Sequence, residues 1–465
     1  MKVLITLSLF FCCVLLGRTS WAEETSSVTV TVYNHGQALI NEVREVELPS
    51  GSGLVEFSGV AETIEAPTLQ VRSLTAPEAF VVLDMNYEYD LISVQSLLDR
   101  YVGKTLNVVL PDPHDRTSTV LREAVLLANN DRPIFQVDDQ IFVGNHDAVY
   151  LAEIPAGLRP RPTLVWLVHN DGPPRQHLDV SYLAGGMNWQ ADYVLKVDRD
   201  NERAALSGWV TLDNQSGLAF EQASLKLVAG EVNVVRPEPV RMRRDMVLAS
   251  PMAAEQMQQE EFFEYHLYSL PRLVDIANRQ TKQVSLLQAP EMGLSKKLVA
   301  RFGGYPNPGQ GTIRQGVDVF LTFKNAEAEG LGLPLPRGIV RAYQESRDGS
   351  TLFIGEDRID HTPRDADVEL RMGRAFDVNV ERTLTAHEQL GRNMVRYTWE
   401  IRIRNSKDEP QQLLLEDTLF GDWRITTSSH AYDQLDARRI RFTLDVPPSS
   451  EQDQLLLSYT VESRT

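Results

Sequence analysis

Cysteine is almost absent from this sequence. The 465 residues include two cysteines, Cys12 and Cys13, and both lie inside the apolar run near the start of the chain. If that run is removed, the remaining chain can form no disulfide, thiol nucleophile, Cys-ligated zinc site or iron–sulfur site. A mature protein of this kind has to be stabilised by its hydrophobic core alone.

Residues 1–22 are typical of a secretory signal peptide. Lys2 gives a positive start, residues 3–16 form an apolar run, and residues 20–22 (SWA) resemble a cleavage site. The run is shorter than the roughly 20 residues of a spanning helix, which favours cleavage over a membrane anchor. A lipoprotein is disfavoured because no Cys stands at the cleavage point. We therefore expect an exported protein, in the periplasm or at the outer cell surface of a Gram-negative bacterium, with no transmembrane segment after cleavage.

Basic residues are scarce relative to acidic ones. The chain has 46 Lys and Arg against 64 Asp and Glu, a formal charge of −18, and cleavage would remove Lys2 and Arg18 to leave −20. Such a surface repels nucleic acid and anionic lipid. The expected partner is therefore an envelope protein or a glycan, and not a nucleic acid.

Common catalytic motifs are also missing. The sequence has no G-x-G-x-x-G, Walker loop, G-x-S-x-G or S-x-x-K. His387 and Glu388 begin like a metalloprotease helix, but Gly391 occupies the position of the second zinc ligand. We therefore predict no catalytic residue, no metal ligand and no cofactor.

Two acidic clusters match known sites only in part. Residues 198–201 (DRDN) begin like a calcium loop, but Arg203 and Trp209 stand where a Gly and a bidentate carboxylate are needed. A solvated hairpin tip accounts better for these charges. In the EDRIDH segment, Asp357 and His361 would share one face of a strand, and an acid–base or metal role would require further groups from elsewhere.

Two aromatic runs could form a binding site. They are YLAGGMNWQADY at 182–193 and FFEYHLY at 262–268. Their side chains could line a groove for a sugar or a peptide, or they could pack a sheet while their polar tips find partners within the protein. The residues concerned are Tyr182, Trp189, Tyr193, Tyr265, His266 and Tyr268.

Alternation of apolar and polar residues dominates the chain. In residues 394–404 the apolar side chains occupy every second position, which only a strand with one solvated face explains. Strands of this kind are typical of antiparallel sheets. Helical signals are few: Ser93 can cap a short helix that ends at Gly103, with Val94, Leu97, Leu98 and Tyr101 on one side.

Four apolar segments end in an asparagine followed by a polar turn. The asparagines are Asn170, Asn214, Asn325 and Asn405. Asparagine tolerates left-handed backbone and bonds its own main chain, so it suits a corner between strands. This repeated pattern indicates either a repeated sandwich module or the ordinary corners between strands of a β-protein.

These patterns predict a mainly β protein of tandem antiparallel β-sandwich modules with few helices. After the signal peptide at 1–22, we expect an N-terminal β domain at 23–155 that includes a small barrel-like insertion, of SH3-like or Sm-like type, at about 91–150. A central β-sandwich region at 156–370 would be interrupted by an exposed, partly helical linker at about 237–261. A C-terminal immunoglobulin-like sandwich would occupy 371–465.

Several segments resemble the DUF4139 family of bacterial proteins, which is defined by a domain of unknown function. They include YLAGGMNWQADYVL at 182–195, FFEYHLYSLP at 262–271, GLGLPLPRGIVRAY at 330–343 and FIGEDRIDHTP at 353–363. The resemblance implies an exported, β-rich protein without an assigned activity, so it assigns no residue a role. Some mucoidy inhibitor-like relatives carry a long coiled coil before this domain, and the region from 90 to 165 shows no sustained heptads.

The expected function is therefore a non-catalytic scaffold of the cell envelope with a binding or assembly role. The alternative is a glycan-binding or glycan-hydrolysing envelope protein, which the Tyr and Trp runs and the many carboxylates favour.

Overall fold

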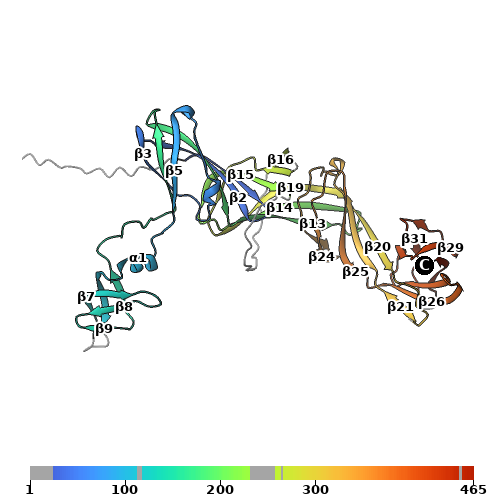
Figure 1. Ribbon diagram of the computed structural model, residues 1–465. Helices are drawn as coiled ribbons and strands as arrows, with labels where there is room; N and C mark the ends of the chain where they lie inside the picture. Colours follow the sequence, from blue (N-terminus) through green and yellow to red (C-terminus); the bar gives the residue numbers. More distant parts are fainter. Residues whose placement is uncertain are drawn as a thin grey trace, which may run out of the picture. The chain divides into compact units, whose positions relative to one another are not determined.

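The computed structural model describes residues 25–112, 118–230, 257–262, 265–309, 311–449 and 453–464. The predicted signal peptide at 1–22 lies outside these residues. Within them the protein is mainly β, as predicted, and α1 (Val94–Tyr101) is the single α-helix (Figure 1). Short 3₁₀ turns are η1 (Ala66–Thr68), η2 (Pro77–Ala79) and η3 (Glu327–Glu329). No helix of the described part has the length and apolar character needed to cross a membrane.

The chain folds into two compact units. The first takes in residues 25–29 and Leu39–Ala184, and the second takes in Val30–Ala38 and the described residues from 185 onward. The three points of division fall within β1 (Thr25–Tyr33), β2 (Gln37–Glu47) and β12 (Arg175–Gly185). In the first unit, β2 pairs with β12, which in turn pairs with β4 (Gln70–Ser73). A three-stranded sheet of the same unit has the order β3 (Gly51–Ser58), β11 (Thr163–Asn170) and β5 (Phe80–Glu88).

A five-stranded sheet of the first unit packs against α1. Its order is β10 (Ala148–Tyr150), β6 (Thr105–Pro111), β7 (Thr119–Ala128), β8 (Ile134–Val137) and β9 (Gln140–Phe142). As predicted, Ser93 caps α1: its Oγ accepts from the Ser96 backbone N at 3.0 Å, while the Ser96 hydroxyl accepts from the Ser93 N at 2.9 Å. The helix buries Leu98 and Tyr101 in the core of this sheet, but Val94 is exposed, so the apolar side is narrower than expected.

The predicted closure of this region into a barrel is wrong. Among the described residues, β9 and β10 lie at opposite edges of the sheet and pair only with β8 and β6. Each of these edge strands has three residues. A barrel needs strands long enough to stagger and to bond around the whole ring, and edges this short provide too few backbone groups.

The second unit contains three large sheets and one smaller group of strands. The smaller group orders β16 (Gln258–Phe262), β17 (Tyr265–Ser269) and β15 (Phe220–Ala229), and β15 also pairs with β18 (Val274–Ile276). The first large sheet orders β19 (Gln280–Gly293), β14 (Arg203–Asn214), β13 (Met187–Val197), β23 (Gly338–Glu345) and β24 (Thr351–Ile359). Within it, β13 and β23 run parallel and the other neighbours antiparallel.

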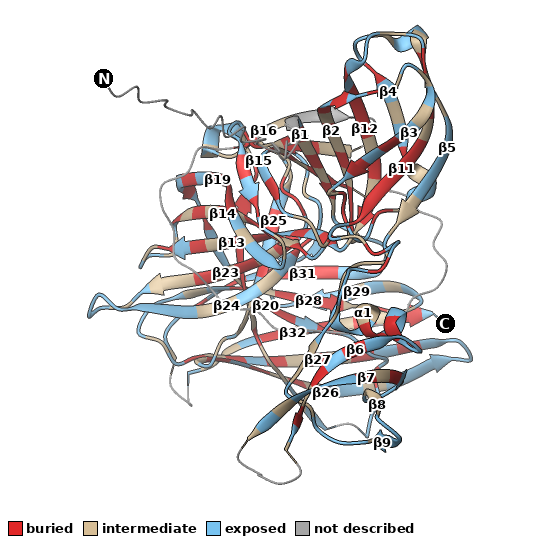
Figure 2. Ribbon diagram, turned by 90° about the vertical axis from the view of Figure 1, so that its left-hand side faces the viewer, coloured by how far each residue is buried: buried red, intermediate tan, exposed pale blue. Residues whose placement is uncertain are grey.

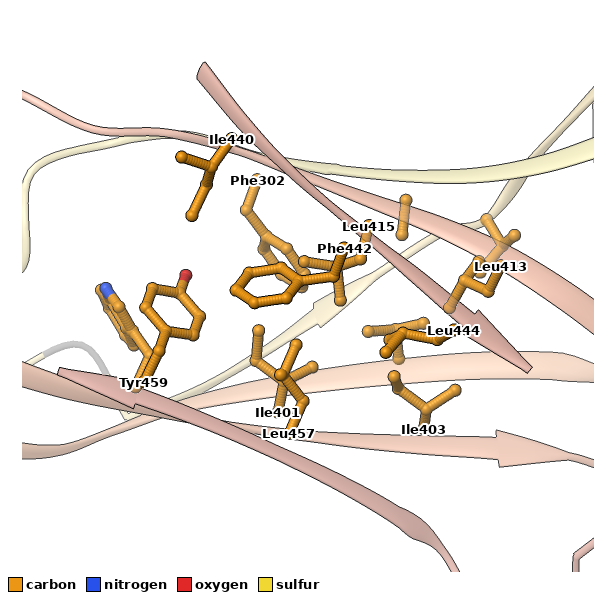
Figure 3. Close-up of a cluster of buried hydrophobic side chains, with 14 of the residues drawn as sticks. Phe302, Ile401, Ile403, Leu413, Leu415, Ile440, Phe442, Leu444, Leu457 and Tyr459 are labelled. Atoms are coloured by element: carbon orange, nitrogen blue, oxygen red, sulfur yellow. The ribbon is translucent and has the colours of Figure 1, made fainter. Parts of the chain in front are cut away.

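Two further sheets share one hydrophobic core. A six-stranded sheet orders β25 (Asp367–Arg374), β22 (Asp318–Lys324), β20 (Ser295–Phe302), β28 (Gln411–Thr418), β31 (Arg439–Val446) and β30 (Asp433–Gln434), with β20 and β28 parallel. A five-stranded sheet orders β21 (Thr312–Gln315), β26 (Val378–Gly391), β27 (Met394–Asn405), β32 (Leu455–Arg464) and β29 (Asp422–Ser428). Figure 3 shows the shared core, with Phe302, Leu413, Leu415, Ile440, Phe442 and Leu444 from one sheet and Ile401, Ile403, Leu457 and Tyr459 from the other.

The predicted alternation is confirmed in β27. Its buried residues fall at every second position. The same alternation, interrupted only by the additionally buried Asp192 and Thr211, occurs in β13 and β14, whose burial colouring is shown in Figure 2. The predicted linker is partly wrong: its residues up to 256 lie outside the described part, but Gln258–Phe262 form strand β16, which pairs with β17. Pairing with a neighbouring strand has overridden the weak local preference of this Gln- and Glu-rich stretch.

One ion pair crosses the shared core. The Arg382 guanidinium in β26 donates to both Asp417 carboxylate oxygens in β28, at 2.8 and 3.1 Å. The Tyr459 hydroxyl donates to the same carboxylate at 2.5 Å, and the guanidinium lies 3.7 Å from the ring centre of Trp399. A buried ion pair is tolerated only when such further contacts satisfy both charges. This one links the two sheets through the core.

The four predicted corner asparagines share one arrangement. Each is at most 1% exposed, each Nδ2 donates to two backbone carbonyls, and each Oδ1 accepts a backbone N–H. For Asn405 the carbonyls belong to Glu409 and Val446 and the N–H to Lys407. A single amide therefore satisfies buried backbone groups on both sides of a turn, which confirms the predicted corner role.

We predict that Asn405→Ala lowers the free energy of unfolding by about 2–3 kcal/mol, because it leaves buried backbone groups without partners. Urea denaturation measures this change. The matched control is Asn379→Ala in the neighbouring strand β26, where the side chain is exposed and the change should stay within about 0.5 kcal/mol. Equal losses for the two variants would contradict the corner role.

Candidate functional site

The candidate site is a polar cavity of about 1010 Å³ in the second unit. Three turns form its walls: those between β13 and β14, between β23 and β24, and between β27 and β28, together with the start of β20. Its lining residues are Arg199, Asp200, Asn201, Glu202, Leu294, Ser295, Lys296, Leu298, Gln344, Glu345, Ser346, Arg347, Leu352, Ile354, Glu409, Pro410, Gln411 and Gln412.

A second cavity of about 310 Å³ adjoins the first. The two share Arg199, Asn201, Lys296, Gln344 and Ile354. The smaller one continues over β22 and β25 and is further lined by Val319, Leu321, Met372, Gly373 and Arg374. We call the two cavities together the Lys296 groove, the larger one its polar part and the smaller one its apolar part.

The strand period places Lys296 in the groove. In β20, Lys296 shares a face with Leu298, Ala300 and Phe302, which are buried in the shared core. Lys296 lies directly opposite Leu321 of β22, so both side chains project from the same face of the sheet. The lysine therefore stands where the apolar face of the sheet meets solvent.

Lys296 has no hydrogen bond or ion-pair partner within 4.0 Å among the described residues, whereas most arginines of the groove do. Partial burial by the groove walls lowers the pKa of Lys296, and the positive charge of Lys407 lowers it further. The Glu409 carboxylate opposes this shift. Lys407 and Glu409 both lie in the turn that Asn405 organises, so the corner asparagine sets the charge environment of the lysine.

Hydrogen bonds hold the turns of the groove in place. Arg199 donates to the Glu345 carboxylate at 3.0 Å and to the Ser346 carbonyl at 2.9 Å. Gln344 donates to the Asp198 carbonyl at 2.7 Å and to the Asn201 side chain at 3.1 Å. The walls are therefore preformed by contacts between the first two turns.

The lining of the groove suits an extended peptide. Asn, Gln and Ser side chains can hydrogen-bond peptide N–H and C=O groups, and acids and bases of both signs can pair with charged side chains. Leucine and isoleucine side chains provide apolar surface. No aromatic ring is among the lining residues of either cavity, and within the described part no group of three or more His, Cys, Asp or Glu could hold a metal ion.

Three of the aromatic candidates of the second unit are buried. Trp189, Tyr193 and Tyr268 are at most 3% exposed. The Tyr193 hydroxyl donates to the Pro336 carbonyl and the Tyr268 hydroxyl to the Pro334 carbonyl, both at 2.8 Å. Burial raises the pKa of both phenols, which keeps them protonated as donors. These residues pack the protein and fix the loop before β23.

The other aromatic candidates are also engaged within the protein. Tyr182 is fully buried in the first unit, and its hydroxyl donates to the Glu42 carboxylate at 3.0 Å. In the second unit, Tyr265 and His266 are half-buried in β17, and the His266 Nδ1 lies 3.0 Å from the Gln259 amide. The structure therefore does not bring the six residues together to line a groove.

The acidic candidates have structural roles. One Asp357 oxygen accepts from the Arg358 backbone N at 2.8 Å and the other from the Arg371 N at 2.7 Å, so this carboxylate joins the edges of β24 and β25. His361 lies beyond the end of β24 and accepts from the Arg337 N at 3.2 Å. Asp357 and His361 thus do not form one site.

The two incomplete metal motifs, His387-Glu388 and residues 198–201, lie in a strand and in a turn, respectively. His387 lies in β26, opposite Tyr397, and Glu388 follows it in the same strand. Residues 198–201 form the predicted hairpin tip: the Asp198 N donates to the Arg203 carbonyl at 3.0 Å, and the Asp198 carboxylate accepts from the Glu202 N at 3.0 Å. The sequence did not indicate that this tip forms a wall of the groove.

A serine, a histidine and an aspartate also meet in the first unit. The Ser52 hydroxyl lies 3.0 Å from the His169 Nδ1, and the His169 Nε2 lies 3.3 Å from an Asp171 oxygen. The distances match a nucleophile–base–acid relay, but Ser52 and Asp171 are exposed and His169 is about half exposed. Hydrolytic relays act in sites that exclude water, where their electrostatic interactions are strong. We therefore place the candidate site at the Lys296 groove.

A comparison with protein families gives a match over more than half of the chain. The family model described as "Domain of unknown function (DUF4139)" matches residues 178–455. All lining residues of the Lys296 groove fall within this range. None of the curated proteins matches the chain.

We predict that Lys296 reacts faster with acetic anhydride near pH 8 than the adjacent Lys297, because its lowered pKa leaves more of the amine neutral. Mass spectrometry after brief labelling measures both rates. Glu409→Gln should raise the Lys296 rate, since it removes the opposing charge, and Lys407→Gln should lower it. A Lys296 rate that neither variant changes would contradict the assigned cause.

Proposed function

The chain belongs to the DUF4139 family, which has no assigned function, and from this premise we propose that it is an exported, non-catalytic binding protein of the cell envelope. The Lys296 groove is its binding site, and the ligand is an extended segment of another polypeptide. The observation that carries this proposal is the lining itself: amide and hydroxyl side chains, charges of both signs and aliphatic surface in one cavity of about 1010 Å³.

The preformed walls favour binding. A site whose turns are already held by hydrogen bonds loses little conformational freedom when a ligand enters. Peptides present alternating N–H and C=O groups that Asn and Gln side chains can satisfy together. The groove contains no pair of groups that the sequence or the geometry identifies as a nucleophile and its base, which supports binding without turnover.

A glycan ligand is the less favoured alternative. Glycan sites commonly stack sugar rings on aromatic side chains, and the sequence offered Tyr and Trp residues for this purpose. Those residues are buried or bonded within the protein, and no aromatic ring lines the groove. A polypeptide partner therefore fits the described chemistry better.

The finer architecture and the location are part of the proposal. We infer that the two sheets sharing a core form an immunoglobulin-like sandwich, because their buried faces contribute to one cluster. Export is supported by the charge and apolar pattern of residues 1–22. The distant likeness to mucoidy inhibitor-like proteins stays a prediction, and it concerns only the region that the family model matches, residues 178–455.

We predict that the protein recovered from the periplasm or the cell surface begins at Glu23, because cleavage is expected after Ala22. Edman degradation or N-terminal mass spectrometry of the native protein checks this. Replacement of Leu9 and Phe10 with Arg should retain the full-length chain inside the cell. An uncleaved protein that starts at Met1 in the envelope fraction would contradict the proposed processing.

We predict that Gln411→Trp weakens peptide binding at least about tenfold, because residue 411 lies on the same face of the sheet as Lys296 and the indole fills the polar part of the groove. Fluorescence anisotropy with the mature chain and a panel of labelled twelve-residue peptides of varied sequence measures affinity. Thr443→Trp, on an exposed position of the same sheet that does not line the groove, is the matched control.

A panel of envelope polysaccharides is tested in parallel for binding and for release of reducing ends. The proposal is supported if peptides bind and if Gln411→Trp weakens this binding while Thr443→Trp does not. Binding of polysaccharides alone, or peptide binding that Gln411→Trp leaves unchanged, would reject it.

A further inference from the structure

We propose that the Lys296 groove recognises the C-terminus of its polypeptide ligand, with the terminal carboxylate beside Lys296 and an apolar last side chain in the apolar part. This inference rests on the proposed function and specifies which end of the ligand the groove reads. It is carried by a difference in composition between the two adjoining cavities.

The apolar part combines apolar surface with positive charge. Val319, Leu321, Ile354 and Met372 provide the apolar surface. Its charged lining residues are Arg199, Lys296 and Arg374, and no carboxylate lines it. By contrast, the polar part includes four acidic residues beside its cations. A negatively charged group is therefore favoured more strongly in the apolar part, where no carboxylate competes with it.

Of the three cations that line the apolar part, Lys296 is the most available to a ligand. Arg199 is paired with Glu345 at 3.0 Å, and Arg374 lies 3.6 Å from Asp318. Lys296 has no such partner among the described residues; the nearby Lys407 adds to the positive potential there, and the Glu409 carboxylate reduces it by a smaller amount. A ligand carboxylate beside Lys296 would offset the repulsion between Lys296 and Lys407. It would also accept a charge-assisted hydrogen bond from the Lys296 ammonium group.

The size and the surroundings of the apolar part favour a peptide end over a fatty acid. Its volume of about 310 Å³ equals that of about ten water molecules, which is the size of one large amino-acid residue with its carboxylate. The space next to it is lined by Asn201, Gln344 and further polar residues, which suit the preceding peptide backbone. An acyl chain would have to lie along this polar lining without hydrogen-bonding it.

The test uses the mature chain and four probes. Two are labelled six-residue peptides that end in leucine, one with a free carboxylate and one with a C-terminal amide. The third has the same sequence with aspartate in the last position, and decanoate serves as an unlabelled competitor. Affinities are measured for the wild type, Lys296→Gln, Lys296→Arg and Lys297→Gln. Lys297 lies on the opposite face of β20 and is the matched control.

The free leucine peptide should bind at least about tenfold more tightly than its amide or the aspartate peptide. Lys296→Gln should remove the preference for the free carboxylate, Lys296→Arg should retain it, and Lys297→Gln should leave it unchanged. Equal melting temperatures of the variants confirm that the fold is intact.

Equal binding of the free and amidated peptides, with Gln411→Trp still blocking both, would overturn this inference and leave the proposed function standing. Displacement of the free peptide by decanoate at similar affinity would assign the apolar part to an acyl carboxylate and also overturn it. If no peptide binds at all, the proposed function fails and this inference fails with it.

Discussion

A buried asparagine amide at the end of a strand is the interaction on which much of this structure depends. A protein built mainly of sheets has to turn its chain repeatedly, and every turn near the core leaves backbone groups that water cannot reach. At four such places one Asn side chain satisfies two carbonyls and one N–H. Asn325 does so for the segment that leads into β23, and Asn405 does so for the turn that carries Lys407 and Glu409. The same device therefore closes corners and positions the charges of the groove.

The groove is a consequence of sheet register. Lys296 faces the groove because β20 alternates and because its apolar neighbours must enter the shared core. If the register of β20 shifted by one residue, Lys297 would face the groove. Leu298, Ala300 and Phe302 would then leave the shared core. The same packing that stabilises the sheet therefore also decides which residue stands at the edge of the core face, next to solvent.

The sequence predicted much of the local structure of the chain. Alternation in residues 394–404 predicted β27, the Ser93 cap predicted α1, and the four asparagines predicted buried corners. These signals are local, so one segment is enough to recognise each of them. Barrel closure was predicted wrongly because it depends on which strands pair at the edges, and β16 was missed because pairing outweighed its composition.

The candidate site could not be predicted in the same way. Lys296 has no unusual neighbours in sequence, and its groove is built from turns that are far apart in the chain. The Tyr and Trp residues attracted attention by type, yet their burial and their hydroxyl partners depend on tertiary contacts. Only the hairpin tip at 198–201 was recognised as a turn, and its place in the groove followed from β13 pairing with β23.

The parallel pairing of β20 with β28 has a kinetic consequence. It joins Leu298 to Leu413, so a long loop of chain must close before these strands can bond. Contacts of such high sequence separation form slowly and are slowest where strands run parallel. The cavity walls beside this pair come from residues between 199 and 412, so the cavity is complete only when that whole range has folded. A nascent chain that ends before residue 412 therefore lacks part of the cavity, and its occupancy by a ligand requires the finished fold.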